Sequence, residues 1–226
     1  MIKAIRQVLR VFADHGLFGE GVELVGSWCF YFYQLKLGAR QFPLKTLDVD
    51  FLIPNPFKGQ EHPDFIRTLE TLGFNSDFKS DGSLYLWNSE LKIEFLTPDK
   101  GRGSDKAIRI RKLGIDAIPL RFIGLLLDKP MLIQDGDFEI LVPDPARFCL
   151  HKLIVAYRRK NLEKSSKDLQ QAICTFSVAD CQTVGKIFAT LPRKWRAAIL
   201  TMLQKADSEF PLFKEEIDKL RLILTE

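Results

Sequence analysis

Residues 46–53 alternate polar and apolar side chains with a period of two, the pattern of a β-strand that is buried on one face. Asp48 and Asp50 share the polar face, and Pro54 ends the pattern. Side chains at i and i+2 of a strand point the same way, so the two carboxylates lie roughly 6.6 Å apart at the backbone. We expect the opposite face to be buried: Leu47, Val49 and Phe51.

The motif Pro143-Asp144-Pro145 separates two kinds of pattern. Asp144 as N-cap and Pro145 as the first helical residue predict a sharp helix start. The chain before this motif mixes strands and helices, and the chain after it is helical. The sequence therefore predicts an α/β (α+β) protein with a domain over residues 1–142 and a helical domain over 143–226.

Individual elements follow from periodicity and turn residues. We expect strands at 22–25, 46–53, 74–79, 83–87 and 91–96, and a charged loop at 101–105. The expected helices cover 2–15, 28–37, 63–72, 145–160, 166–176, 178–190, 193–206 and 212–224.

Composition narrows the functional classes. The 226 residues are 46% hydrophobic and 27% charged, which excludes a disordered chain. No apolar run approaches the roughly 20 residues of a membrane span, and charged residues interrupt the amino-terminal segment, so we expect a cytoplasmic protein without membrane contact. The net charge of +4 permits an anionic partner without requiring one. The four cysteines form no CxxC pair, which favours reduced, buried thiols.

The carboxylates of Asp48 and Asp50 indicate a divalent cation. Unit charges about 4 Å apart repel by roughly 4 kcal/mol at an effective dielectric near 20, and a cation removes that penalty. Oxygen ligands suit Mg²⁺ or Mn²⁺. Glu94 lies between Ile93 and Phe95 in another expected strand, and it joins the pair if the two strands are neighbours. Three carboxylates at one place suit phosphoryl or nucleotidyl transfer.

Gly26-Ser27 lies between an expected strand and an expected helix. Glycine lets the backbone approach an anion, and a helix start presents free N–H groups to it. The Ser27 hydroxyl is within reach of a terminal phosphate, although Ser27 as an ordinary N-cap is an alternative.

This ordered set resembles the nucleotidyltransferase superfamily of the DNA polymerase β type. Over about residues 20–175 the chain is also similar to bacterial stand-alone nucleotidyltransferase-like proteins, which are related to toxins of abortive-infection systems of the AbiEii kind. The third carboxylate is Glu where many relatives carry Asp, and the phosphate turn lacks a second serine. The motifs behind this similarity, beyond the core set, are 92–98, 120–122, Pro143-Asp144-Pro145, His151-Lys152-Leu153, Lys167-Asp168-Leu169 and Gln171-Ala172.

The resemblance implies a short mixed sheet with flanking helices, followed by a helical bundle. It also implies metal-dependent transfer of a nucleoside monophosphate from a nucleoside triphosphate. On this view Asp48, Asp50 and Glu94 are catalytic and bind the metal. Gly26 and Ser27 bind phosphate, and the helical region contributes Lys152, Lys167 and Asp168 to nucleotide binding. A purely structural role competes for Asp168, because Ser165 and Asp168 fit a capping box.

The acceptor stays open among a tRNA, a protein and a small molecule, and the sequence does not indicate the nucleoside triphosphate or the oligomeric state. Two other functions are kept. One is a catalytically idle relative that binds nucleotide or acts in a toxin–antitoxin pair. The other is a nucleic-acid-binding module built on the basic helices, against which the modest net charge argues.

Overall fold

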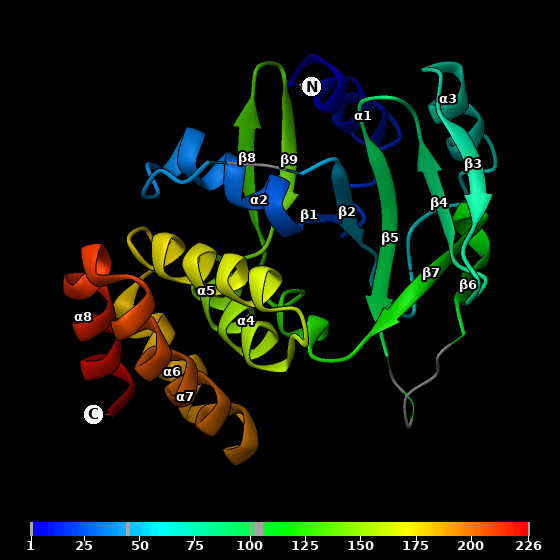
Figure 1. Ribbon diagram of the computed structural model, residues 1–226. Coiled ribbons are helices and arrows are strands. Elements are labelled where there is room, and N and C mark those ends of the chain that lie inside the picture. The colour runs from blue at the N-terminus through cyan, green and yellow to red at the C-terminus, as the bar shows by residue number, and fades with distance from the viewer. Residues whose placement is uncertain (1, 44–45, 100, 102–105, 226) are drawn as a thin grey trace. The chain divides into compact units, whose positions relative to one another are not determined.

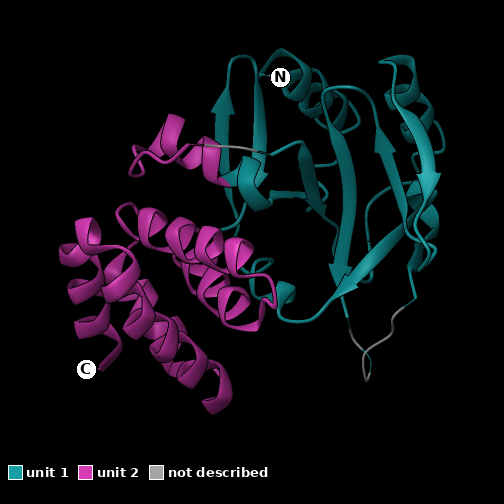
Figure 2. Ribbon diagram, viewed as in Figure 1, with its two compact units in different colours: residues 1–29, 44–143 teal, residues 30–43, 144–226 magenta. Residues whose placement is uncertain are grey.

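The computed structural model describes residues 2–43, 46–99, 101 and 106–225 (Figure 1). Most of the expected loop at 101–105 therefore lies outside the described residues. The chain forms two compact units, drawn in different colours in Figure 2. Unit 1 contains residues 1–29 and 44–143, and unit 2 contains residues 30–43 and 144–226.

Unit 1 is built on a mixed sheet in which β5 lies between β2 and β4 (Figure 1). The strand order is β1-β2-β5-β4-β3, and β7 pairs with β5 and with β6. The pairs β2–β5 and β5–β7 are parallel, and the other pairs are antiparallel. The strands are β1 (Glu23–Val25), β2 (Asp48–Leu52), β3 (Asn75–Phe78), β4 (Leu84–Trp87), β5 (Lys92–Pro98), β6 (Ile108–Ile110) and β7 (Ile115–Leu120).

Aromatic rings cover one face of this sheet. The helices α1 (Ile2–Asp14) and α3 (Phe65–Thr71) supply rings that pack on the strands. Phe12 of α1 stacks on Phe51 of β2 with ring centroids 3.6 Å apart, and Phe65 of α3 contacts Phe12 and Phe95 edge-on. Because side chains alternate along a strand, this packing directs Asp48 and Asp50 to the opposite face.

Two features of unit 1 differ from the sequence-based expectation. Leu47 was expected to be buried, but it is 54% exposed because β2 begins only at Asp48. The strands β6 and β7 were not predicted. β6 is only three residues long and β7 contains Pro119, so neither gives the long alternation of polar and apolar residues on which the prediction relied.

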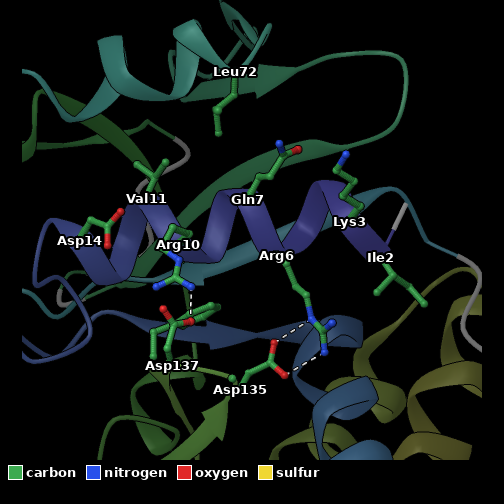
Figure 3. A pocket seen from close by; sticks show the side chains of 12 residues that line it. Ile2, Lys3, Arg6, Gln7, Arg10, Val11, Asp14, Leu72, Asp135 and Asp137 are labelled. Carbon is green, nitrogen blue, oxygen red and sulfur yellow. Dashed lines mark hydrogen bonds and ion pairs between the residues drawn. The ribbon is translucent and has the colours of Figure 1, made fainter.

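A separate hairpin of β8 (Met131–Asp135) and β9 (Phe138–Val142) completes unit 1. Arg6 of α1 binds the buried carboxylate of Asp135 through two hydrogen bonds of 2.9 and 3.0 Å. Arg10 pairs with Asp137 and lies over the ring of Phe138. These contacts fasten the polar side of α1 to the hairpin (Figure 3).

Unit 2 is helical, as the sequence predicts. Its inserted segment begins within α2 (Gly26–Phe32) and continues as a π-helical turn over Tyr33–Leu37, which ends at Gly38 in the left-handed conformation. The edge of the Tyr33 ring contacts Phe148, and Arg40 pairs with Glu216. The remaining helices are α4 (Pro145–Arg158), α5 (Leu162–Phe176), α6 (Cys181–Thr190), α7 (Arg193–Glu209) and α8 (Lys214–Thr225).

Helix caps confirm one prediction and correct another. The carboxylate of Asp144 accepts hydrogen bonds from the backbone N–H groups of Ala146 and Arg147, so it caps α4 as expected. The capping box expected at Ser165 and Asp168 is wrong. Asn161 caps α5 through the N–H of Lys164, which places Ser165 and Asp168 inside the helix.

Three of the four cysteines match the expectation of buried, free thiols. All four cysteines are free thiols: Cys29, Cys149 and Cys174 are buried and Cys181 is half-buried. Burial raises the pKa of the Cys149 thiol to about 12. Across the part of the chain that the structure describes, no helix is long and apolar enough to cross a membrane.

Candidate active site

The register of the sheet brings the three sequence-predicted carboxylates to neighbouring positions. β2 pairs in parallel with β5 so that Asp50 lies opposite Glu94 and Asp48 lies opposite Lys92. On the other side of β2, Val25 lies opposite Asp50. Paired residues point to the same face of a sheet, so Asp48, Asp50 and Glu94 share the face that the aromatic rings leave uncovered.

Gly26 follows β1 directly and lies against Asp50. Its backbone has φ of 69°, a left-handed conformation that favours glycine. A Cβ atom placed on Gly26 would lie closer than 3.0 Å to Asp50 Oδ2, a separation that real Cβ atoms essentially never show. The absence of a side chain at position 26 is therefore what lets the carboxylate of Asp50 approach the strand-to-helix turn.

Ser27 lies inside the first turn of α2, because this helix begins at Gly26, two residues before the expected start. The alternative of Ser27 as the N-cap of this helix stays a prediction, because the backbone of Gly26 is left-handed and not helical. Ser27 follows Gly26, the residue that contacts Asp50, and its side chain is half-buried. Gly26, Ser27, Asp48, Asp50 and Glu94 all belong to unit 1.

Two lysines hold the Glu94 side chain. The ammonium groups of Lys79 and Lys92 lie 2.9 Å and 2.5 Å from the same oxygen, Glu94 Oε1. Burial opposes ionisation of Glu94, but these hydrogen-bonded ion pairs outweigh it and hold the pKa of this carboxyl below its usual value. Lys92 precedes Glu94 by two residues in β5, whereas the approach of Lys79 to Glu94 depends on the long-range pairing of β3, β4 and β5.

The donor chemistry at Asp48 and Asp50 fits Mg²⁺ or Mn²⁺, since carboxylate oxygens are the ligands these hard cations prefer. In residues 2–43, 46–99, 101 and 106–225, no three Asp, Glu, His or Cys side chains are grouped closely enough to hold a metal ion. Glu94 fits as a third ligand only after its lysines release it.

Glu23 lies on the same sheet face as Asp50, and the sequence did not lead us to expect it there. It lies opposite Leu52, so it shares the face of Asp50. It is 1% exposed, and its Oε2 has no hydrogen-bond partner among the described residues. Burial raises the pKa of Glu23 to about 8, so the side chain is mostly protonated at neutral pH. A glutamate between the apolar residues Val22 and Leu24 was the available signal.

The helical candidates form a cluster of their own in unit 2. Lys152 of α4 donates a hydrogen bond of 2.6 Å to Asp168 of α5, and Arg159 donates one of 2.9 Å to the other oxygen of the same carboxylate. Burial opposes ionisation of Asp168, but the two cations prevail and lower its pKa. Lys167 is half-buried beside it in the sequence.

His151 precedes Lys152 on α4 and stays neutral. Burial lowers the pKa of His151 to about 3, and the positive charge of Lys152 adds to the effect. Its Nδ1 atom has no hydrogen-bond partner within the described part of the chain. A neutral ring beside the ion pair leaves Lys152 and Arg159 as the cations of this cluster.

None of these residues lines the cavity of about 750 Å³ beside α1 (Figure 3). Of its three cations, Arg6 and Arg10 pair with Asp135 and Asp137, and the charge of Lys3 is matched in number by Asp14. The cavity therefore offers no excess charge for a phosphate, and the carboxylate face remains the candidate active site.

Comparisons with known proteins show the family of the chain. The profile of a family described as nucleotidyltransferase matches residues 3–198. Among curated proteins, no match to this chain was found.

One solved structure shows the same kind of fold, and two others match less closely. A nucleotidyltransferase-like antigenic protein from Paracoccidioides brasiliensis superposes with a TM-score of 0.57 at 11% identity, over 96% of this chain and 93% of that one. The antibiotic-resistance factor ANT(2'')-Ia matches with a TM-score of 0.42 at 10% identity, over 92% of this chain and 93% of that one. A tRNA nucleotidyltransferase bound to a primer tRNA and an ATP analogue gives 0.27 at 19% identity, over 88% of this chain and 60% of that one.

The contact between Gly26 and Asp50 gives a first prediction. Gly26→Ala forces the Asp50 carboxylate to move, because the added Cβ meets the end of that side chain. We expect the affinity for Mn²⁺ to fall at least about ten-fold, with a stability loss of only about 1–2 kcal/mol from the left-handed backbone. Titration calorimetry and urea unfolding measure the two effects.

Gly136→Ala is the matched control for Gly26→Ala. Gly136 has the same φ of 69°, and nothing lies within 4 Å of an added Cβ. This variant should lose similar stability and keep its Mn²⁺ affinity. Equal Mn²⁺ affinities in the two variants would contradict the assigned contact.

Glu23→Gln tests the buried, protonated carboxyl. The pKa of Glu23 is raised from 4.5 to about 8, so its contribution to stability is complete below pH 4.5 and is lost as pH rises to 8. We expect the variant to unfold like the wild type near pH 4 and to be more stable by about 4 kcal/mol at pH 8. Urea unfolding across this range measures the difference. A stability difference between the variant and the wild type that does not change with pH would argue against a raised pKa of Glu23. The exposed residue Glu139 provides the control variant, Glu139→Gln.

Asp168→Asn tests the buried ion pair. It leaves Lys152 buried without a counter-charge, so we expect a loss of about 3–5 kcal/mol. Because the pKa of Asp168 is lowered, the wild-type advantage is present above pH 3.8 and disappears as pH falls through the folded-state pKa. The control Asp218→Asn removes an exposed pair with Arg221 and should cost less than about 1 kcal/mol. Equal losses in urea unfolding near pH 7 would contradict the buried role.

Proposed function

The chain belongs to the nucleotidyltransferase family, and from this premise we propose that it transfers a nucleoside monophosphate from a nucleoside triphosphate to a hydroxyl acceptor and releases pyrophosphate. The observation that carries the proposal is the juxtaposition in unit 1. Asp50 lies against the Gly26 turn and in register with Glu94, so the turn proposed to bind phosphate and the carboxylates proposed to bind metal are neighbours on one sheet face.

Asp48, Asp50 and Glu94 would hold Mg²⁺ or Mn²⁺ in this function. When bound, the metal neutralises charge on the triphosphate and stabilises the charge that develops during transfer. Lys79 and Lys92 hold Glu94 by salt bridges, so full ligation by Glu94 requires that these ammonium groups move away from Oε1.

The other residues position the donor. The backbone at Gly26 and the Ser27 hydroxyl would bind the β- and γ-phosphates, in line with the general affinity of helix starts for anions. The assignment of Lys152, Lys167 and Asp168 to nucleotide binding stays a prediction from the sequence. Within unit 2, Asp168 holds the ammonium group of Lys152. Arg159 shares Asp168 with Lys152, which leaves this cluster with an excess positive charge.

The transfer step is a displacement at the α-phosphorus. The acceptor oxygen forms a bond to this phosphorus, and the bond to the oxygen that bridges the α- and β-phosphates breaks. Pyrophosphate leaves with that electron pair. The proton of the acceptor hydroxyl passes to an active-site carboxylate oxygen, which acts as general base.

The salt bridges at Glu94 favour a second candidate. A protein whose third carboxylate stays bound to two lysines would bind nucleotide without turnover, as a sensor or as a component of a toxin–antitoxin pair. The two candidates differ in whether label from the α-phosphate reaches an acceptor.

A transfer assay tests the proposal. Purified protein receives Mg²⁺ or Mn²⁺ and each of four α-labelled nucleoside triphosphates, with bulk tRNA, a cell extract or the protein itself as acceptor. We expect label transfer by the wild type and a loss of about 10²-fold or more in Asp48→Asn/Asp50→Asn, because the charges that bind the metal are gone.

Asp64→Asn is the control for the double variant. Asp64 is an exposed aspartate that precedes α3 and does not belong to the group of Asp48, Asp50 and Glu94. Its replacement should leave transfer unchanged. Undiminished transfer by Asp48→Asn/Asp50→Asn would refute the mechanism. Metal-dependent nucleotide binding without any transfer would select the idle candidate.

A further inference from the structure

Two aromatic side chains continue the carboxylate rows across the sheet. In β4, Tyr85 lies opposite Glu94 and Trp87 lies opposite Lys92. The rows therefore run Asp50–Glu94–Tyr85 and Asp48–Lys92–Trp87 on one face. Adjacent strands are about 4.8 Å apart, so Trp87 starts about 10 Å from Asp48, close enough for one ligand to touch both.

Trp87 presents its ring to solvent. It is 44% exposed, whereas Trp28 is buried and Trp195 is half-buried. The strand beneath it is anchored, because Leu84 and Leu86 on the other face of β4 belong to the core. A large exposed ring on a rigid strand beside the carboxylates is a surface on which a planar ligand stacks.

Tyr85 and the lysines add polar recognition to this surface. The Tyr85 hydroxyl donates a hydrogen bond of 3.1 Å to Asp77, and the Lys92 ammonium lies 4.8 Å from the centre of the Tyr85 ring. Lys79 and Lys92 share the single carboxylate of Glu94, so two ammonium groups are concentrated at this point of a face that otherwise carries the carboxylates Asp48, Asp50 and Asp77. Aromatic rings with adjacent cations complement a nucleobase followed by a phosphate.

We propose that Trp87, Tyr85, Lys79 and Lys92 form the acceptor subsite, and that its occupant is the unpaired 3′ end of an RNA. The terminal base stacks on Trp87, its phosphate faces the lysines, and its ribose hydroxyl reaches toward Asp48 and Asp50. The inference rests on the proposed function and specifies its acceptor as a single-stranded nucleic-acid end.

A binding experiment tests the subsite without requiring turnover. The probe is a short single-stranded RNA with a free 3′ hydroxyl and a 5′ fluorophore, titrated with full-length protein in Mg²⁺ and followed by fluorescence anisotropy. We expect Trp87→Ala to weaken binding about five-fold to a hundred-fold, the range that loss of one stacked base gives. Trp87→Phe should restore most of the affinity, because it keeps a stacking face.

Phe78→Ala is the matched control. Phe78 is 59% exposed on β3 of the same hairpin, but it pairs with Leu84 and so points to the opposite face from Trp87. This variant should bind the RNA as the wild type does. A blunt duplex of the same RNA should bind more weakly, because its end base stays stacked in the helix.

Three outcomes would overturn the subsite: no RNA binding by the wild type, equal affinities of wild type and Trp87→Ala, or displacement of the RNA from Trp87 by ATP alone. The last would assign the ring to the incoming nucleotide.

The same titration with Asp48→Asn/Asp50→Asn separates the two proposals. Binding that still depends on Trp87, in a protein that transfers nothing, supports the subsite and rejects the chemistry. Transfer to a protein or small molecule, without dependence of RNA binding on Trp87, supports the chemistry and rejects the subsite.

Discussion

The parallel pairing of β2 with β5 is the constraint on which the rest of the site depends. Adjacent parallel strands hold Asp50 and Glu94 at one level, and a shift of one residue would turn one of these side chains to the aromatic core. The stacked rings of Phe12 and Phe51 fix that register, because they require the alternate residues of β2 to stay buried. The same strands therefore supply the buried core residues on one face and the carboxylates on the other.

Charge on the functional face is balanced locally rather than spread over the surface. Glu94 is neutralised by two lysines, Glu23 avoids ionisation by holding a proton, and Asp168 of unit 2 is matched by Lys152 and Arg159. Each arrangement lowers the cost of placing a carboxylate away from water. The carboxylates of Glu94, Glu23 and Asp168 thus differ in how their charge is balanced.

Sequence reasoning predicted the elements that short-range patterns determine. The strand at Asp48, the cap at Asp144 and the helices of unit 2 all follow from periodicity and turn chemistry, and the structure confirms them. Sequence reasoning failed where long-range contacts determine the role of a residue. Asp168 looked like a capping residue because nothing local shows that Lys152 lies one helix away, and Lys79 gave no sign of reaching Glu94. The approach of Asp50 to Gly26 depends on strand register, which local patterns do not contain.

The division of the chain into units has a consequence for biosynthesis. Residues 30–43 of unit 2 interrupt unit 1, so Tyr33 meets its ring partner Phe148 only after more than 100 further residues have been made, because the rest of unit 1 lies between them in the sequence. The partner of Arg40, Glu216, is made later still. On the ribosome, the inserted segment therefore emerges well before the helices on which it packs, and the native contacts of unit 2 form only after those helices have been made.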